Sequence, residues 1–526
     1  MEKYREFILF RSQASPSIRG LVGYTTLPTA TANAPRLTLL DYLGDAAVPE
    51  EPKPVEDLAE LPSLLNRPAP NLRGQVLLVE NITPHLVNLL GSTLGIDPAF
   101  FAGHITADFQ DLETAPPPPS IAILPNRTAE KGFLHVHYQL IVDLDRSSAF
   151  EKSPYALQTD SNVRRSIRRL QDLSGRQLGI ARGCCSLVVT TYGRHWVCLI
   201  LTDPPIKVAV ERLKPDGRKM HPSRPLHGGF EDFMAPTSFS SFEKASRTDP
   251  WSEEEKNCML DSLVRYLSKD GPRLATAAAA PSPDLILAFS YYPIRIALAH
   301  WVMYTQLTSR FLKYYEYSLS DVGARLHKDL VDLQRWRRRC KQSIYKVESL
   351  AVAVNYWLHE LDRGAPKEDD YSSCPARVRY WESVLQDIGQ INAQLQGYNK
   401  SLELMIPVAT SMVQLMDARE SLLHASNTTR LTYIALIFVP LSWVASIFSM
   451  TDEYQPGREK FWVYFAIGLP LVLVILLAST LRFSSAKALG RIWLGVKGFW
   501  GTSGGYVAVG RRKLRGIRSP GKPAAV

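Results

Sequence analysis

Apolar residues along this chain of 526 residues gather into two uncharged segments toward its C-terminal end. Residues 431–451 and residues 461–481 contain no Asp, Glu, Lys or Arg. A helix needs roughly 20 apolar residues to cross a bilayer, and each segment reaches that length. Because only residues 452–460 separate them, the pattern predicts a transmembrane helical hairpin. The chain before it and the chain after it would then lie on the same side of the membrane.

Upstream of the hairpin, the spacing of apolar residues changes from strand-like to helix-like near Trp251. Runs of β-branched and aromatic residues bounded by Gly or Pro predict strands, and these runs are residues 76–79, 134–142, 186–191 and 196–201. A helix is predicted over Pro84 to Leu94. Residues 203–250 are predicted to be loop-like, because Pro, Gly, Ser and Lys are frequent there.

Helical spacing continues over residues 293–361, breaks at residues 362–366 and resumes over residues 376–450. The second run corresponds to a helix on the order of 110 Å long at 1.5 Å per residue, far longer than an ordinary globular helix. We therefore predict a stalk helix that continues into the first span. Pro407 should kink it, because proline removes a backbone donor and crowds the preceding turn.

Together these patterns predict an α+β cytosolic head, a long helical stalk and an all-α membrane part. The expected divisions are a flexible leader over residues 1–73, an α/β domain over 74–290, the stalk over 291–430, the hairpin over 431–481 with spans 431–450 and 461–481, and a tail over 482–526. The leader is inferred from residues 44–73, which are rich in Pro, Glu and Asp.

The formal net charge of +10 comes from the tail alone. Residues 482–526 hold ten Lys or Arg and no Asp or Glu, and the rest of the chain has 51 basic and 51 acidic residues. Lys and Arg beside a span favour the cytoplasmic side, and anionic lipid headgroups attract such a tail. We therefore expect an integral membrane protein of the plasma membrane or an organelle, with both termini cytosolic. Lipids are expected partners, and nucleic acid is not.

Other candidate chemistry is sparse. The sequence has no nucleophile elbow, phosphate loop or metal-ligand spacing, so we do not expect an enzyme. Six cysteines without a CxxC pair are typical of reduced thiols in a cytosolic domain. His104 has no evident metal partners, and His135 and His137 are interpreted as ordinary strand residues. The basic run Arg335–Lys341 is interpreted as a solvated helix face or as one paired with acidic residues of a neighbouring stalk, with a lipid or nucleic-acid patch as the alternative.

The first span and the loop after it carry two motifs at fixed spacing. The span reads Leu431-Thr-Tyr-Ile-Ala-Leu-Ile-Phe-Val-Pro-Leu-Ser442 and ends in Ser449-Met450-Thr451, and the loop reads Glu453-Tyr-Gln-Pro-Gly-Arg458. These residues resemble the CorA family of divalent-cation channels, in which the helix runs Leu-Thr-x-Ile-x-x-Ile-Phe-x-Pro-Leu-Thr and ends in Gly-Met-Asn. The residues from Leu94 to His104 similarly resemble the N-terminal domain of eukaryotic CorA-like proteins. The chain thus looks like a divergent eukaryotic member.

That resemblance implies a homopentamer that transports a divalent cation, Mg²⁺ or a related ion, with no tightly bound cofactor. It places the family's signature carbonyl at Thr451, which offers a shorter hydroxyl, and the family's signature glycine at Ser449. It also matches Ser442 to a pore hydroxyl and Glu453 to a loop acid. A second acid of the family loop aligns with Gly457, so that charge is missing here.

One face of the predicted first span collects polar side chains at 100° per residue. The positions within roughly 60° of one another are Asp417, His424, Thr428, Ala435, Ser442, Ser446 and Ser449. Hydroxyls on the inner face of a ring of helices can replace hydration water around an ion. Alternatively, small residues at this spacing let helices pack closely. The candidate pore-lining and mouth residues are Ser442, Ser446, Ser449, Met450, Thr451, Glu453 and Asp417.

Two hypotheses follow. The first is a homo-oligomeric CorA-like channel for divalent metal cations. The second is a non-conducting CorA-like membrane scaffold or regulatory paralogue, which the altered Ser449-Met450-Thr451 ending favours.

Overall fold

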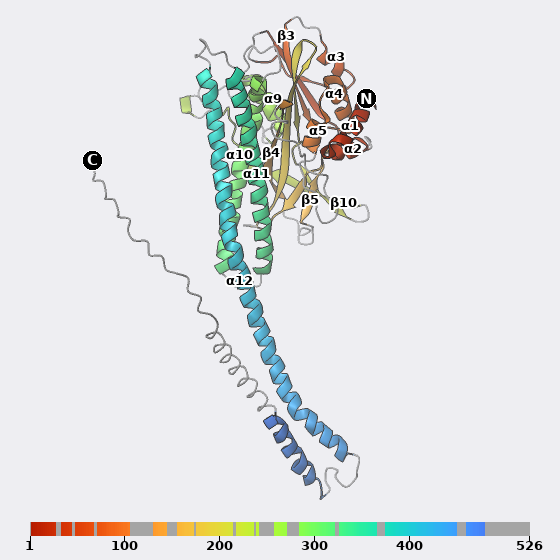
Figure 1. Cartoon of the computed structure of the whole chain (residues 1–526), viewed down its shortest axis with the longest axis vertical. Helices are drawn as coiled ribbons and strands as arrows, with labels where there is room; N and C mark the ends of the chain where they lie inside the picture. The colour runs from red at the N-terminus through yellow and green to blue at the C-terminus, as the bar shows by residue number, and fades with distance from the viewer. Residues whose placement is uncertain are drawn as a thin grey trace, which may run out of the picture. The chain divides into compact units, whose positions relative to one another are not determined.

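The computed structural model describes residues 2–27, 33–44, 48–67, 71–105, 130–144, 155–172, 175–213, 217–235, 238–240, 257–270, 283–320, 326–364, 374–449 and 459–478. It divides into two compact units, residues 1–411 and residues 412–526, and each is described by itself. The helices of unit 1 (Figure 1) are α1 (Glu2–Ala14), η1 (Pro16–Ile18), α2 (Arg19–Thr25), α3 (Leu61–Leu65), α4 (Pro84–Leu94), α5 (Pro98–Ile105), η4 (Leu226–Gly228), α9 (Met259–Asp270), α10 (Pro283–Ser320), α11 (Leu326–Gly364) and the first part of α12 (Cys374–Phe448). Its strands are β1 (Arg36–Leu43), β2 (Lys53–Pro54), β3 (Leu72–Glu80), β4 (Phe133–Leu144), β5 (Ala156–Thr159), β6 (Ser166–Arg169), β7 (Gln177–Tyr192), β8 (His195–Thr202), β9 (Val208–Leu213) and β10 (Gly217–Pro225).

The ten strands form one sheet in the order β2-β1-β3-β8-β7-β4-β10-β9-β5-β6. Only β3 and β8 pair in parallel among these neighbours, and the other pairs are antiparallel. Because β6 also pairs with β7, the strands from β7 round to β6 close into a small barrel. The barrel has its own apolar core, made of Val142, Leu144, Leu157, Ile167, Ala181 and Ala209.

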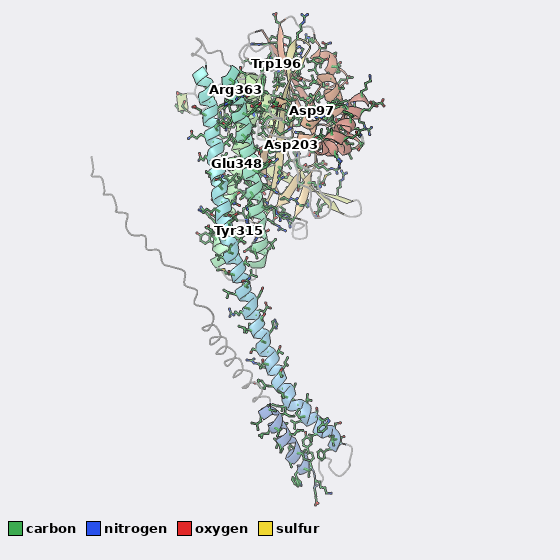
Figure 2. The ribbon with its side chains drawn as sticks, viewed as in Figure 1. Asp97, Trp196, Asp203, Tyr315, Glu348 and Arg363 are labelled. Atoms are coloured by element: carbon green, nitrogen blue, oxygen red, sulfur yellow. The ribbon has the colours of Figure 1, made fainter. Side chains whose placement is uncertain are left out.

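Helices cover both faces of the open part of the sheet. In Figure 1, α1, α2, α4 and α5 lie on one side of the strands, and α10 and α11 lie on the other. Phe289 of α10 packs against Trp196 of β8 and Tyr42 of β1, with ring centroids 5.2 and 5.8 Å apart. All residues of β8 are buried, as expected for a strand covered on both faces. Figure 2 labels Trp196 within this layer.

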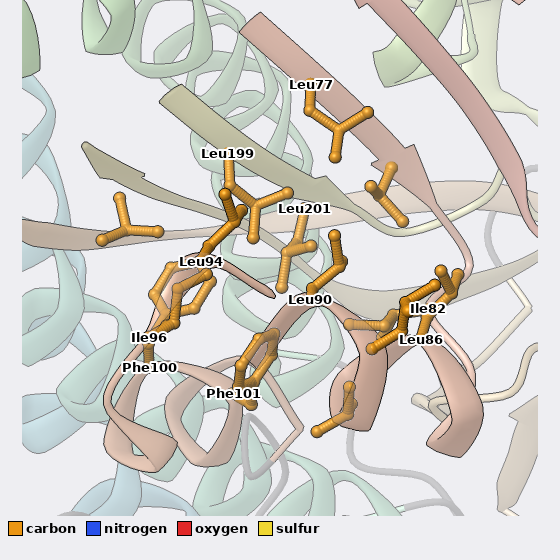
Figure 3. Close-up of a cluster of buried hydrophobic side chains, with 14 of the residues drawn as sticks. Leu77, Ile82, Leu86, Leu90, Leu94, Ile96, Phe100, Phe101, Leu199 and Leu201 are labelled. Carbon is orange, nitrogen blue, oxygen red and sulfur yellow. The ribbon is translucent and has the colours of Figure 1, made fainter. Parts of the chain in front are cut away.

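The main core lies between the sheet and the α4–α5 layer (Figure 3). Leu77, Leu199 and Leu201 project from β3 and β8 toward Leu90 of α4 and Phe101 of α5. The sequence sets the ends of α4 clearly. The Thr83 hydroxyl accepts a hydrogen bond from the Leu86 amide at 3.2 Å, and Pro84 follows it at the first helical position. Gly95 then ends the helix at φ 64°, a left-handed conformation that suits glycine.

The prediction of a flexible leader over residues 1–73 is wrong. These residues form α1, α2, α3 and β1, and the side chains of Ile8, Ile18 and Leu21 are fully buried in the main core. The Tyr4 hydroxyl donates to the Ile96 carbonyl at 2.7 Å, and the Tyr24 hydroxyl donates to the Ile82 carbonyl at 2.6 Å. The Pro and acidic residues that suggested a leader lie mainly in the connection between β1 and α3.

Of the other expectations for the head, the strands and the first predicted helix are confirmed, and the loop prediction is partly wrong. The strands predicted at residues 76–79, 134–142, 186–191 and 196–201 are confirmed as parts of β3, β4, β7 and β8, and the helix Pro84–Leu94 is confirmed. The loop-like prediction for residues 203–250 is wrong for β9 and β10. It failed because β10 contains two prolines and faces solvent over much of its length.

The long helices agree with the sequence pattern, since α10 and α11 cover the first predicted run and α12 the second. The predicted division at residues 290 and 291 falls inside α10, which is part of the head core. Of the basic run Arg335–Lys341, Arg337 and Lys341 lie 3.6 and 3.2 Å from Glu403 of α12, and Arg335 lies 2.8 Å from Asp332. Three residues of this run are therefore paired with acidic residues of the same chain, and pairing with a neighbouring stalk stays a prediction.

We predict that Leu21→Ala destabilises the head by about 2–5 kcal/mol, because it leaves a cavity in a closed core. Leu9→Ala on α1 is the matched control, since Leu9 is 46% exposed, and its effect should stay within about 0.5 kcal/mol. Denaturant unfolding of the full chain, followed by tryptophan fluorescence, measures both. Equal unfolding midpoints for the two variants would contradict the placement of α2 in the core.

Candidate functional site

Two helices of the described chain are long and apolar enough to cross a membrane by length and composition. They are residues Asp284–Ser318 of α10 and Tyr380–Phe448 of α12. The most apolar window of α10 is 83% buried inside the structure, and that of α12 is only 11% buried. Burial marks α10 as a core helix of the head. The end of α12 and the shorter apolar helix Trp462–Ala478 are therefore the candidate spans.

In unit 2 the helix Trp462–Ala478 packs against one face of α12. We call this the packing face, made of Pro440, Leu441, Val444 and Phe448, of which Pro440 and Val444 are buried. The Tyr464 hydroxyl donates to the Leu441 carbonyl at 3.4 Å, and the Tyr464 and Phe448 rings lie 6.5 Å apart. A Cβ at Gly468 would stand 3.4 Å from Leu441 Cδ2, which is about van der Waals distance, so the two helices lie close together at this point.

The predicted serines lie on a different face of the same helix. Ser442, Ser446 and Ser449, which we call the serine face, are all exposed in the isolated chain. At 100° per residue the centre of the serine face is roughly 150° from the centre of the packing face. The second helix of the hairpin therefore leaves the serine face free to meet other helices.

Large apolar side chains cover most of the remaining hairpin surface. Phe438 and Trp443 are 65% and 61% exposed on α12, and Leu469 is 63% exposed on the second helix. Soluble monomers rarely expose contiguous apolar patches larger than a few hundred Å². Such a surface is suited to lipid or to copies of the same hairpin.

The seven sequence-predicted site residues divide into two sets. The described set comprises Ser442, Ser446, Ser449 and Asp417, and all four are exposed. Met450, Thr451 and Glu453 lie outside the described residues. The sequence pattern did not single out Tyr464 and Gly468, which lie against Leu441 of α12. The sequence indicates them only by an aromatic residue and a glycine one helical turn apart in an apolar segment.

The Ser442 hydroxyl has a defined orientation, since it donates to the Val439 carbonyl at 2.9 Å. The hydroxyls of Thr428 and Thr432 likewise donate to carbonyls of the preceding turn, at 2.9 and 2.8 Å. A hydroxyl carries one donor and two acceptor lone pairs. With its proton directed at the backbone, each oxygen keeps lone pairs for an incoming water or cation.

Acidic groups stand on α12 before the span. His424 Nε2 lies 3.7 Å from Glu420 Oε1, both side chains are exposed, and Asp417 is exposed one turn earlier. Within the described part of a single chain, no group of three His, Cys, Asp or Glu side chains could hold a metal ion.

A separate polar cluster lies inside the head. Asp203, labelled in Figure 2, accepts two hydrogen bonds from Arg165 at 3.0 and 2.9 Å. The Ser186 hydroxyl lies 2.9 Å from His104 Nδ1 and 2.8 Å from His135 Nδ1. Burial lowers the pKa of His104 well below its usual value and that of His135 to about 3, so both rings are neutral.

Ser, His and Asp in contact are the residue types of a hydrolytic triad. Here the Ser186 side chain is fully buried and its hydroxyl is shared by two histidines, so no substrate reaches it. The cluster instead joins α5, β4 and β7 to the segment after β8. Its role is structural.

Comparisons with known proteins give matches only among solved structures. No protein-family model matches the chain, and no curated protein sequence matches it significantly. The complete structure of the CorA magnesium transporter from Methanocaldococcus jannaschii aligns at 9% identity and a TM-score of 0.33, over 85% of this chain and 97% of that one. The structure of the full-length CmaX protein aligns at 11% identity and a TM-score of 0.33, over 85% of this chain and 96% of that one.

We predict that Ser446→Cys forms intermolecular disulfides on mild oxidation of the purified full chain, because the serine face is free to meet its equivalent in another copy. Ile447→Cys is the matched control. It is one residue away and also exposed, but it lies roughly 130° from the centre of the serine face. Non-reducing electrophoresis distinguishes them. Equal cross-linking of both variants, or of neither, would contradict a contact centred on the serine face.

Proposed function

We propose that this chain is the subunit of a homo-oligomeric, CorA-like channel for divalent metal cations, with Mg²⁺ or a related ion as cargo. The observation that carries the proposal is the position of the serine face, which lies away from the packing face of the same helix. The sequence resemblance of Leu431–Ser442 to the first span of that family supports the same assignment.

A lone hairpin cannot conduct, because the ion would meet lipid and apolar side chains. Several copies around an axis can conduct if each presents oxygens to that axis. Turning the serine face inward directs the packing face, and with it the helix Trp462–Ala478, outward. Exposed side chains such as Phe438 and Leu469 are then covered by lipid or by neighbouring hairpins. We propose five copies on the strength of the family resemblance.

The serine hydroxyls suit a hydrated ion better than a dehydrated one. Mg²⁺ gives up its water reluctantly and is often held through that water. Ser442 already donates its proton to the Val439 carbonyl, so its lone pairs can accept hydrogen bonds from the water shell. A ring of such oxygens guides a hydrated cation without binding it too tightly to leave.

The two ends of the proposed pore carry acidic or polar side chains in the sequence. Asp417 and Glu420 precede the span, and a ring of these carboxylates would raise the local cation concentration. At the other end, Met450, Thr451 and Glu453 form the proposed mouth and loop. Thr451 would supply a hydroxyl where the family signature supplies an amide carbonyl.

The orientation in the membrane follows from the same layout. We propose that the head and the basic tail are cytosolic, in a plasma or organelle membrane, and that the tail contacts anionic lipids. No tightly bound cofactor is required, because the cation is the cargo. Nucleic acid has no part in this function.

The second candidate is a CorA-like membrane scaffold or regulatory subunit that does not conduct. The observation that favours it is the Ser449-Met450-Thr451 ending together with Gly457 in place of a loop acid. Serine resists backbone shapes open to glycine, and a hydroxyl reaches less far than an amide. A scaffold could keep the hairpin and its assembly while losing the mouth.

We predict that the double variant Ser449→Gly, Thr451→Asn raises Mg²⁺ flux in liposomes, or creates it, because it restores the flexible backbone and the side-chain carbonyl at the mouth. The measurement is uptake into proteoliposomes loaded with a Mg²⁺-sensitive dye. Thr429→Asn is the matched control, since it makes the same side-chain change roughly 130° away from the serine face and should leave flux unchanged.

The outcomes separate the two candidates. If the unaltered protein conducts and the double variant gains no flux, then Ser449-Met450-Thr451 forms a functional pore mouth. That result would exclude the scaffold hypothesis. If neither protein conducts Mg²⁺ or a related divalent ion, the channel proposal fails. The reverse substitutions in an active CorA channel serve as a positive control for the role of these two side chains.

A further inference from the structure

A cavity of about 550 Å³ lies within the head, and all the residues that border it belong to unit 1. It is bordered by β4, α10, β10 and two connecting segments, residues 203–207 and 228–230. This volume lies within the range of small-molecule sites, which are mostly apolar with a few placed polar groups. Neither the packing of the fold nor the proposed ion transport explains this cavity.

Flat rings form one wall of the cavity. The Tyr138 and His300 rings stack with centroids 5.2 Å apart and planes 16° apart, and Phe230 meets His300 edge-on at 5.5 Å. Burial lowers the pKa of His300 to about 4, so its ring is neutral at pH 7. The structure assigns its ring nitrogens no hydrogen bond within the described chain. The wall therefore offers an apolar surface with an open polar edge.

The loop beside this wall has an unusual backbone. His227, Gly228 and Gly229 follow one another with φ values of 55°, 73° and 94°, and His227 is one of only two such non-glycine residues in the described chain. A Cβ at Gly229 would stand 2.3 Å from Asn257 Oδ1. Non-glycine residues in this region cost on the order of 1–3 kcal/mol each and tend to occur at functional sites.

Another part of the lining contains two prolines and two cationic side chains. Pro204 and Pro205 restrict its backbone, and the Ser223 hydroxyl donates to the Ile206 carbonyl at 3.0 Å. Lys207 and Arg224 are the cations that border the cavity, and both are exposed. The one bordering carboxylate, Asp203, already accepts hydrogen bonds from Arg165 and from the Cys184 amide at 2.8 Å.

We propose that this cavity binds a small aromatic anion, with its flat body against His300 and Phe230 and its acidic group at Arg224. A guanidinium suits both carboxylate and phosphate groups. An aryl carboxylic acid and a nucleoside monophosphate share this chemistry. The site is independent of the channel proposal, since every residue that forms it lies in unit 1.

The test is equilibrium dialysis of the full-length protein in mild detergent against adenosine 5′-monophosphate and, separately, naphthalene-2-carboxylate, with protein-free micelles subtracted. We expect at least one of the two probes to bind at one molecule per chain. Binding of adenosine 5′-monophosphate alone would favour a nucleotide as the ligand, and binding of naphthalene-2-carboxylate alone would favour an aryl carboxylic acid. Arg224→Gln should weaken that binding by about tenfold. Arg218→Gln is the matched control, since it removes an exposed arginine of the same strand that does not border the cavity.

Met303→Trp provides a second variant, because the larger ring fills the cavity from α10 and should abolish binding. Its unfolding temperature, compared with that of the unaltered protein, confirms that the head is folded. The proposal is overturned if neither probe binds at millimolar concentration. It is also overturned if Arg224→Gln and Met303→Trp bind as tightly as the unaltered protein.

Discussion

In unit 2, each helix of the hairpin covers only one face of the other helix, and the remaining faces stay exposed. The proposed function of unit 2 depends on this constraint. Val444 is buried in their contact, while Phe438, Trp443 and Leu469 remain largely exposed. The hydrophobic effect works strongly against such a surface in water. Lipid satisfies the apolar positions. The Ser442 hydroxyl donates its proton to the Val439 carbonyl, and the proposed assembly around an axis would give its remaining lone pairs a polar partner.

The head, by contrast, does not need copies of the chain or lipid to cover its sheet. Its sheet is covered on both faces, its barrel closes on a core of its own, and Arg165 and Asp203 satisfy each other inside it. Breaking such a buried pair from one side typically costs about 3–5 kcal/mol, so these residues hold the elements that they join. A self-contained head can carry a separate binding cavity. The cavity beside His300 is consistent with this, because it borders β4 and α10 and lies outside the main core of Figure 3.

Strong local patterns allowed much of this structure to be predicted. The strand around residues 196–201 follows from its β-branched run, and the helix Pro84–Leu94 follows from its helical run. The structure adds that Thr83 and Gly95 cap this helix. The serine face follows from helical periodicity alone. The burial of Ile8 and Leu21 could not be predicted, because short amphipathic helices gain their stability from tertiary contacts. Strand β10 was not predicted, because its prolines are typical of loops. The left-handed conformation of His227 could not be predicted from the sequence pattern.

The central claim is that the hairpin assembles through the serine face, and assembly is measured most directly by the mass of the full chain in mild detergent. Multi-angle light scattering coupled to size-exclusion chromatography, corrected for bound detergent, gives that mass. The proposed channel predicts a single defined multimer, five chains by the family resemblance, that persists on dilution. A stable monomer would contradict the account, because a single hairpin has no axis for its serines to line.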